Sequence, residues 1–98
     1  MKNNFDIPEN VKKEIADHAE KCCVEKVILF GSRARGTNGE RSDIDLAVSG
    51  GNFGDFCFAM DEQVNTLLMF DVVDLASCKS DELISEIERD GVVLYEKV

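Results

Sequence analysis

The amino-acid sequence predicts an α/β (α+β) fold in which helices pack on one face of a single β-sheet. Helical and strand-like patterns alternate along the chain in the order α, β, β, α, β, α, β, and helices placed between strands favour a layered sandwich. The length of 98 residues suits one domain. The 44% apolar and 32% charged residues suit a compact core rather than a disordered chain. We therefore expect residues 1–98 to form a single domain.

The first predicted elements are a helix and a strand. Pro8 fits the first turn of a helix, and the segment after it carries apolar residues at helical spacing, namely Val11, Ile15, and Ala19 or Cys22. VEKVILFGS follows as a short apolar run that ends in Gly31 and Ser32, which predicts a strand running into a tight turn. The next segment, RARGTNGERS, is rich in Gly, Asn, Ser and charge and predicts a loop, with one irregular turn at most.

The segment DIDLAVS predicts a second strand with one apolar face, because Ile44, Leu46 and Val48 alternate with polar or small residues. A helical stripe then predicts a helix that covers this face, through Phe53, Phe56, Cys57, Met60, Val64, Leu67 and Leu68. Phe58 lies off the stripe, so it is either an exposed partner contact or a residue buried at an edge.

MFDVVDLA predicts a third strand, and VVLYE predicts the last one. Between them, Ser80 as N-cap and Gly91 as the stop frame a helix with Leu83, Ile84 and Ile87 turned inward.

Charge and composition exclude several classes of function. The formal net charge of -9 and pI near 4.4 argue against direct nucleic-acid binding, which needs a basic surface. No apolar run approaches the roughly 20 residues of a membrane span, and no signal peptide precedes the fold, so a cytoplasmic protein that does not bind membranes is expected. The four cysteines form no C-x-x-C pair with accompanying histidines, so reduced thiols are expected rather than a zinc site.

Two aspartates on the second predicted strand are candidate metal ligands. Residues two apart on a strand project from one face, roughly 6.5 to 7 Å apart, so Asp43 and Asp45 can aim at one divalent ion. A D-x-D pair alone is a weak signal, and a third carboxylate on a neighbouring strand would strengthen it. Asp71 falls on the same side if the apolar faces of the two strands match. Asp74 would point towards the helices or cap the strand end, and it remains the fallback.

The turn after the first strand is a candidate phosphate site. Gly31 allows close approach of the backbone, and the turn N–H groups with the Ser32 hydroxyl can hold phosphate oxygens. Arg33, Arg35 and Arg41 fall within nine residues and place a positive patch inside an acidic chain. We expect the arginines to offset the charge of a polyphosphate, with Arg33 and Arg35 binding the nucleotide.

The spacing of these motifs resembles that of the minimal nucleotidyltransferases of the DNA polymerase beta superfamily. A strand, GS, ten residues, DID and a later aspartate in an apolar strand carry the resemblance. GSRARG with SDIDL, FDVVDL and DGVVLYE is similar to small members encoded beside HEPN-type partner proteins, over about residues 25 to 96. The resemblance implies a mixed sheet, with Gly31 and Ser32 at the triphosphate. It also implies Asp43, Asp45 and Asp71 as catalytic magnesium ligands, with two ions expected.

The resemblance further implies an enzyme that transfers a nucleoside monophosphate, usually AMP from ATP, to a hydroxyl of a partner protein. In some family members this silences a HEPN toxin, so an antitoxin and a homo- or hetero-oligomer are expected. The chain has no second domain for the acceptor, so a partner subunit would supply that surface. Two alternatives stay open: a non-catalytic antitoxin that neutralises its partner by binding, and a sugar-nucleotide transferase or phosphatase, whose folds generally need a larger chain.

Overall fold

Within residues 6–97, four strands form one sheet in the order β3-β2-β1-β4. The structure, a computed structural model, describes residues 6–97. β1 pairs antiparallel with β2 and with β4, whereas β2 pairs parallel with β3, so the predicted mixed sheet is confirmed. In chain order the elements are α1 (Glu9–Lys21), β1 (Lys26–Phe30), α2 (Gly31–Arg35), β2 (Ile44–Ser49), α3 (Phe53–Glu62), β3 (Phe70–Asp74), α4 (Asp81–Asp90) and β4 (Val92–Glu96).

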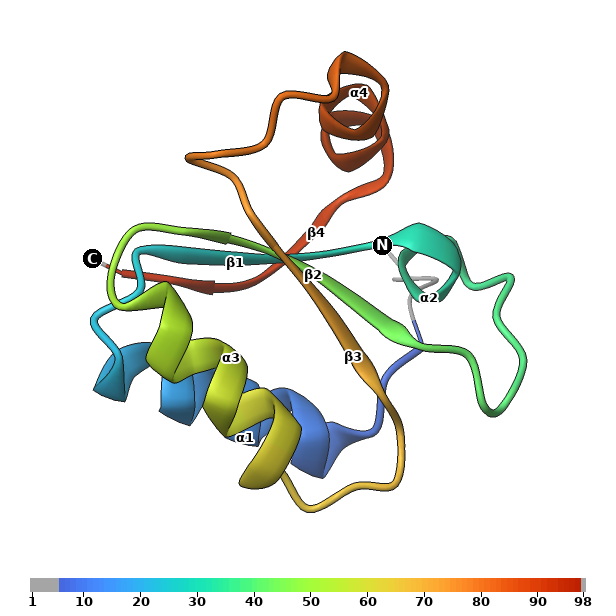
Figure 1. The fold of residues 1–98 in the computed structure, drawn as a ribbon. Helices are drawn as coiled ribbons and strands as arrows, with labels where there is room; N and C mark the ends of the chain where they lie inside the picture. Colours follow the sequence, from blue (N-terminus) through green and yellow to red (C-terminus); the bar gives the residue numbers. More distant parts are fainter. Residues whose placement is uncertain (1–5, 98) are drawn as a thin grey trace.

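The main core lies between the sheet and the pair α1 and α3, which run side by side on one face of the sheet (Figure 1). Ile44, Leu46 and Val48 point into it and are fully buried, as the strand pattern predicts. They pack with side chains of both helices, including Ile15, Phe56 and Met60. No helix among residues 6–97 is long and apolar enough to cross a membrane.

α4 packs on the opposite face of the sheet, where Figure 1 shows it above the strands. The prediction that the helices share one face therefore holds for α1 and α3 and needs correction for α4. The reason is a second, smaller apolar cluster on that face, made by Phe30, Ala47 and Ile87 with Ile28, Val73, Leu75 and Leu83. α4 begins as predicted, because the Ser80 hydroxyl accepts a hydrogen bond from the Leu83 N–H at 3.2 Å.

The helix predicted after the second strand is shorter than its apolar stripe suggests. α3 ends at Glu62 rather than near Leu68, and Leu67 is 101% exposed instead of buried. Two backbone N–H groups of residues 63–69 bond to side chains instead of helical carbonyls: the nearby Thr66 hydroxyl accepts from the Leu68 N–H at 3.2 Å, and the distant Glu14 carboxylate accepts from the Asn65 N–H. Such side-chain bonds compete with helix formation. Phe58 is 59% exposed, so the buried-edge alternative for it is wrong.

Candidate active site

The sheet register brings the predicted aspartates to one face. Asp45 lies directly opposite Asp71 in the parallel pair β2–β3, so the two side chains project from the same side of the sheet. Asp43 immediately precedes β2, two residues from Asp45, and is exposed. Partial burial, together with the charges of Asp71 and Asp43, raises the pKa of Asp45 from its ordinary value of 3.8 to about 6. The three carboxylates are therefore electrostatic neighbours.

Asp74 lies on the other side of the same strand. Its partner in the register is Val48, which points into the main core. The Asp74 carboxylate accepts a hydrogen bond from the Ala76 N–H at 3.0 Å and so caps the end of β3. Of the two candidates for a third carboxylate, the register favours Asp71, because Asp71 shares a face with Asp45 and Asp74 does not.

The carboxylates suit a divalent cation by their chemistry. Oxygen donors are the ligands that Mg²⁺ prefers, and a cation would relieve the repulsion that raises the pKa of Asp45. Across residues 6–97, however, no three His, Cys, Asp or Glu side chains are already gathered as a metal-binding group. Asp43 and Asp71 are exposed, and their side chains make no bond to any residue from 6 to 97, so they have room to turn towards an ion held at Asp45.

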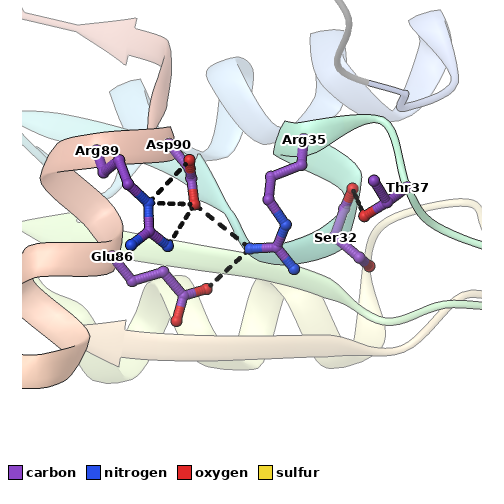
Figure 2. Close-up of polar contacts among 6 residues, drawn as sticks. All are labelled: Ser32, Arg35, Thr37, Glu86, Arg89 and Asp90. Atoms are coloured by element: carbon purple, nitrogen blue, oxygen red, sulfur yellow. Dashed lines mark hydrogen bonds and ion pairs between the residues drawn. The ribbon is translucent and has the colours of Figure 1, made fainter.

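Gly31 lets the backbone lie against Asp45. Its φ is +76°, and a Cβ at this position would overlap the Asp45 Oδ2 atom. The chain then forms α2, a five-residue helix where the sequence predicts a tight turn and loop, and Gly36 ends it with φ 77°. Figure 2 shows Ser32 on α2, with the Thr37 hydroxyl bonded to its carbonyl oxygen at 3.5 Å. The Ser32 side chain itself has no partner within the described chain, so its hydroxyl is available to a ligand.

Arg33 is a structural residue, which corrects its predicted role in binding nucleotide. Its side chain is buried, with only 3% of the residue exposed. The guanidinium donates hydrogen bonds to the carbonyl oxygens of Ser42, Asp6 and Glu40, each at 3.0 Å. It therefore ties the segment before α1 to the loop that leads to Asp43, and it is not directed at the carboxylate face.

Arg35, the second arginine predicted to bind nucleotide, pairs with carboxylates of α4 in the structure. Its Nη1 atom lies 3.4 Å from both the Glu86 Oε2 and the Asp90 Oδ2 atoms of α4 (Figure 2). Its side chain is 40% exposed, and its charge acts on Asp45 to lower the pKa of that carboxyl. Ser32 and Arg35 are three residues apart on α2 and so share one side of this helix.

Glu86 and Asp90 border the site, although the sequence pattern predicts no role for them. Asp90 also accepts from Arg89 at 2.9 Å, which lowers the pKa of Asp90 together with Arg35. The signal was their separation of four residues, which puts two carboxylates on one face of a helix. Nothing in the sequence indicated that this face would meet α2, because the expected position of α4 was the other side of the sheet.

The sequence matches one known family model over almost its whole length. Residues 9–98 match the family model described as "Polymerase beta, Nucleotidyltransferase". A protein of Methanocaldococcus jannaschii named "Putative protein adenylyltransferase MJ0604" is 41% identical over 81 residues, a match that covers 74% of this chain and 79% of that protein.

The fold is also similar to solved structures. A crystal structure of a toxin-antitoxin with AMP-PNP matches with a TM-score of 0.71 and 23% identity, over 88% of this chain and 73% of the other. Two mutants of the toxin-antitoxin MntA-HpeT match with TM-scores of 0.70 and 0.64, at 21% and 24% identity, over 88% and 94% of this chain and 73% and 75% of theirs. At these identities the likeness concerns the fold.

Proposed function

This chain belongs to the polymerase beta nucleotidyltransferase family, and from that premise we propose that it is a magnesium-dependent protein adenylyltransferase that moves AMP from ATP to a hydroxyl of a partner protein. The observation that carries the proposal is the register of β2 and β3, which pairs Asp45 with Asp71 beside the Gly31 turn. Phosphoryl transfer to a hydroxyl needs carboxylates that hold metal ions and, beside them, a turn that accepts phosphate.

Three carboxylates would hold the metal, namely Asp43, Asp45 and Asp71, with two ions expected from the family. Bound magnesium would lower the pKa of the acceptor hydroxyl and offset the negative charge that builds up on the phosphates. The chain itself would position the triphosphate of the nucleotide. The unpartnered Ser32 hydroxyl and nearby backbone amides would hold phosphate oxygens, and Arg35 would neutralise part of the triphosphate charge.

The transfer is a substitution at the α-phosphorus of ATP. The acceptor oxygen forms a bond to that phosphorus, the bond from it to the bridging oxygen breaks, and pyrophosphate leaves with the electron pair. The hydroxyl proton needs a base. We assign this role to Asp71, because it is exposed on the edge strand β3, where a macromolecular acceptor has access.

A partner protein is the acceptor class that the comparisons favour. The M. jannaschii relative is named as a protein adenylyltransferase, and the solved chains of similar fold come from toxin-antitoxin pairs. We propose that this chain acts as the antitoxin of a HEPN-type toxin and forms a hetero-oligomer with it. Its carboxylate face is open to solvent at the β3 edge, so such a partner would complete the site.

The proposal is tested by label transfer from ATP that is labelled at the α-phosphate. The chain is incubated with magnesium, this ATP and the protein encoded beside it, and label on the partner is measured for the wild type and for Asp71→Asn. We expect Asp71→Asn to reduce transfer at least about 100-fold, since the base and a metal ligand are lost together.

Asp74→Asn is the matched control, because it makes the same chemical change on the same strand but on the opposite face. Its asparagine oxygen can still accept the bond from Ala76, so transfer should stay near the wild-type rate. Equal rates in both variants would contradict the proposed site. If the Asp71→Asn variant still neutralises the partner although no label is transferred, the result would instead support an antitoxin that acts by binding alone.

A further inference from the structure

A small apolar surface lies beside the candidate active site. Leu67, Leu68 and Met69, together with Arg41, line a hollow of about 380 Å³, which we call the Leu67 surface. Leu67 is 101% exposed and Met69 is 64% exposed. Single exposed apolar residues are common, but two such side chains within three residues, both at one hollow, are typical of a contact surface.

The Leu67 surface is built from the two loops that lead into β2 and β3. Arg41 lies two residues before Asp43, and Met69 lies two residues before Asp71. The end of the second loop bonds to the first residue of β2, since the Met69 carbonyl accepts a hydrogen bond from the Ile44 N–H at 2.9 Å. Because β2 and β3 are parallel, both loops reach the sheet at the end where these two strands begin. The carboxylates lie at this same end, so the Leu67 surface borders them.

The position of this surface points to the acceptor rather than to the nucleotide phosphates. β3 is the edge strand, and β2 separates it from β1, whose end carries the Gly31 turn. The phosphate side and the Leu67 surface therefore lie on opposite flanks of Asp45. A molecule that occupies the Leu67 surface approaches the site from the β3 side, where Asp71 is exposed.

Charge adds a second requirement for the occupant. Three of the four arginines have bonded partners: Arg33 binds backbone carbonyls, and Arg35 and Arg89 pair with carboxylates of α4. Among the described side chains, Arg41 makes no hydrogen bond or ion pair. An exposed guanidinium that stays unpaired in a chain of net charge -9, next to exposed leucine, suits a ligand with a carboxylate beside an apolar side chain.

We propose that the Leu67 surface docks the acceptor segment of the partner protein and selects a segment in which an apolar side chain and a carboxylate flank the modified hydroxyl. The inference rests on the proposed function and deepens it by giving the chemistry of the acceptor. Apolar contact with Leu67 and Met69 supplies binding, and the pairing of the carboxylate with Arg41 fixes the direction of the segment.

The test uses short synthetic peptides, each with a central tyrosine, as acceptors for AMP from ATP with magnesium. One peptide carries Leu and Glu beside the tyrosine, a second carries Leu and Lys, and a third carries Ser and Glu. We expect the first to be labelled at least about tenfold faster, in kcat/KM, than either of the others. Labelling of all three at similar rates would overturn the proposal.

Two variants assign the preference to the surface. Leu67→Ser should lower kcat/KM for the first peptide by roughly tenfold, and its full exposure makes a folding defect implausible as the cause. Arg41→Glu should reverse the preference, so that the peptide with Leu and Lys becomes the better substrate. Val93→Thr, at a half-exposed position on the opposite edge strand β4, is the matched control and should change neither rate.

Nucleotide binding separates failure of this inference from failure of the proposed function. The melting temperature is measured with and without magnesium and ATP, since a ligand of the folded state raises it. If ATP gives no shift in the wild type, the proposed function and the inference both fall. If ATP binds but Leu67→Ser raises the KM for ATP instead of that for the peptide, the surface serves the nucleotide and only the inference is overturned.

Discussion

The two faces of β2 differ in what they contribute. On the side of α1 and α3, Ile44, Leu46 and Val48 are fully buried and form the centre of the main core. On the other side, Asp45 is half-buried beside two further carboxylates, at a raised pKa. Within the six residues of β2, the side chains on one face therefore stabilise the fold, and those on the other face are available for the reaction. Burial of the apolar face holds the strand, and with it the carboxylates, in place. The carboxylates repel one another, and this repulsion opposes folding slightly.

The strongest test of this division is Asp45→Asn. The change keeps the size of the side chain and removes its charge, so transfer of AMP should fall by about 1,000-fold, which corresponds to about 4 kcal/mol. The melting temperature without ligand should stay equal or rise, because a repelled and partly buried charge is lost. A variant that transfers AMP within tenfold of the wild-type rate would show that the carboxylate face is not the site.

Leu46→Ala tests the apolar face one residue away. Removal of a fully buried leucine should lower the free energy of unfolding by about 3 kcal/mol, measured by urea denaturation. Val93→Ala, at a residue that is 48% exposed, should cost below about 1 kcal/mol. If Leu46→Ala costs no more than Val93→Ala, the main core is not what holds the carboxylate strand.

Gly31→Ala tests the contact between the turn and the carboxylate face. The residue has φ +76°, and the added Cβ would overlap the Asp45 Oδ2 atom, so the variant should lose about 2 kcal/mol of stability and weaken ATP binding. Gly36→Ala is the matched control, because Gly36 has nearly the same positive φ, +77°, at the opposite end of α2. It should lose about 1 kcal/mol and bind ATP normally. Equal loss of ATP binding in both would exclude the overlap as the cause.

The smallest expected effect is the pH dependence that Asp45 adds to stability. Its pKa is about 6 in the folded chain and ordinarily 3.8, so between these values the folded state holds more protons than the unfolded state. Stability from this group therefore falls as pH rises from about 4 to about 6. Solvent screening limits the change to below about 1 kcal/mol. The free energy of unfolding of the wild type minus that of Asp45→Asn should decline over this range, and a flat difference would contradict the sign.

Period-2 alternation made the carboxylate face predictable from the sequence. The apolar residues of the second and third strands had to face the same helices, and this requirement alone set Asp71 on the side of Asp45 and Asp74 on the other. The register in the structure has this arrangement. Local signals also sufficed for Ser80 as the N-cap of α4 and for the three buried positions of β2.

Long-range contacts account for what the sequence did not predict. The environment of Arg33 depends on three carbonyls from segments up to 27 residues away, which no local pattern encodes. The position of α4 depends on a small apolar cluster that uses Phe30 and Ala47, neither of which stands out as part of a second core. The end of α3 was missed because the apolar stripe continues past Glu62, whereas Thr66 and Glu14 satisfy the backbone without a helix.

The tie between Arg33 and Asp6 has a practical consequence for anyone who prepares this protein. Asp6 donates its N–H to the Arg33 carbonyl at 2.8 Å, accepts from the Arg33 guanidinium, and accepts from Asn38 in the loop before Asp43. A purification tag or fusion partner joined just ahead of Asp6 would adjoin the residue that bonds this loop. The end of β4 pairs with Lys26, at the other end of β1 from the residue that pairs with Asp45, so a tag placed after β4 stays away from the carboxylates. The two tagged forms should be compared before any weak activity is interpreted.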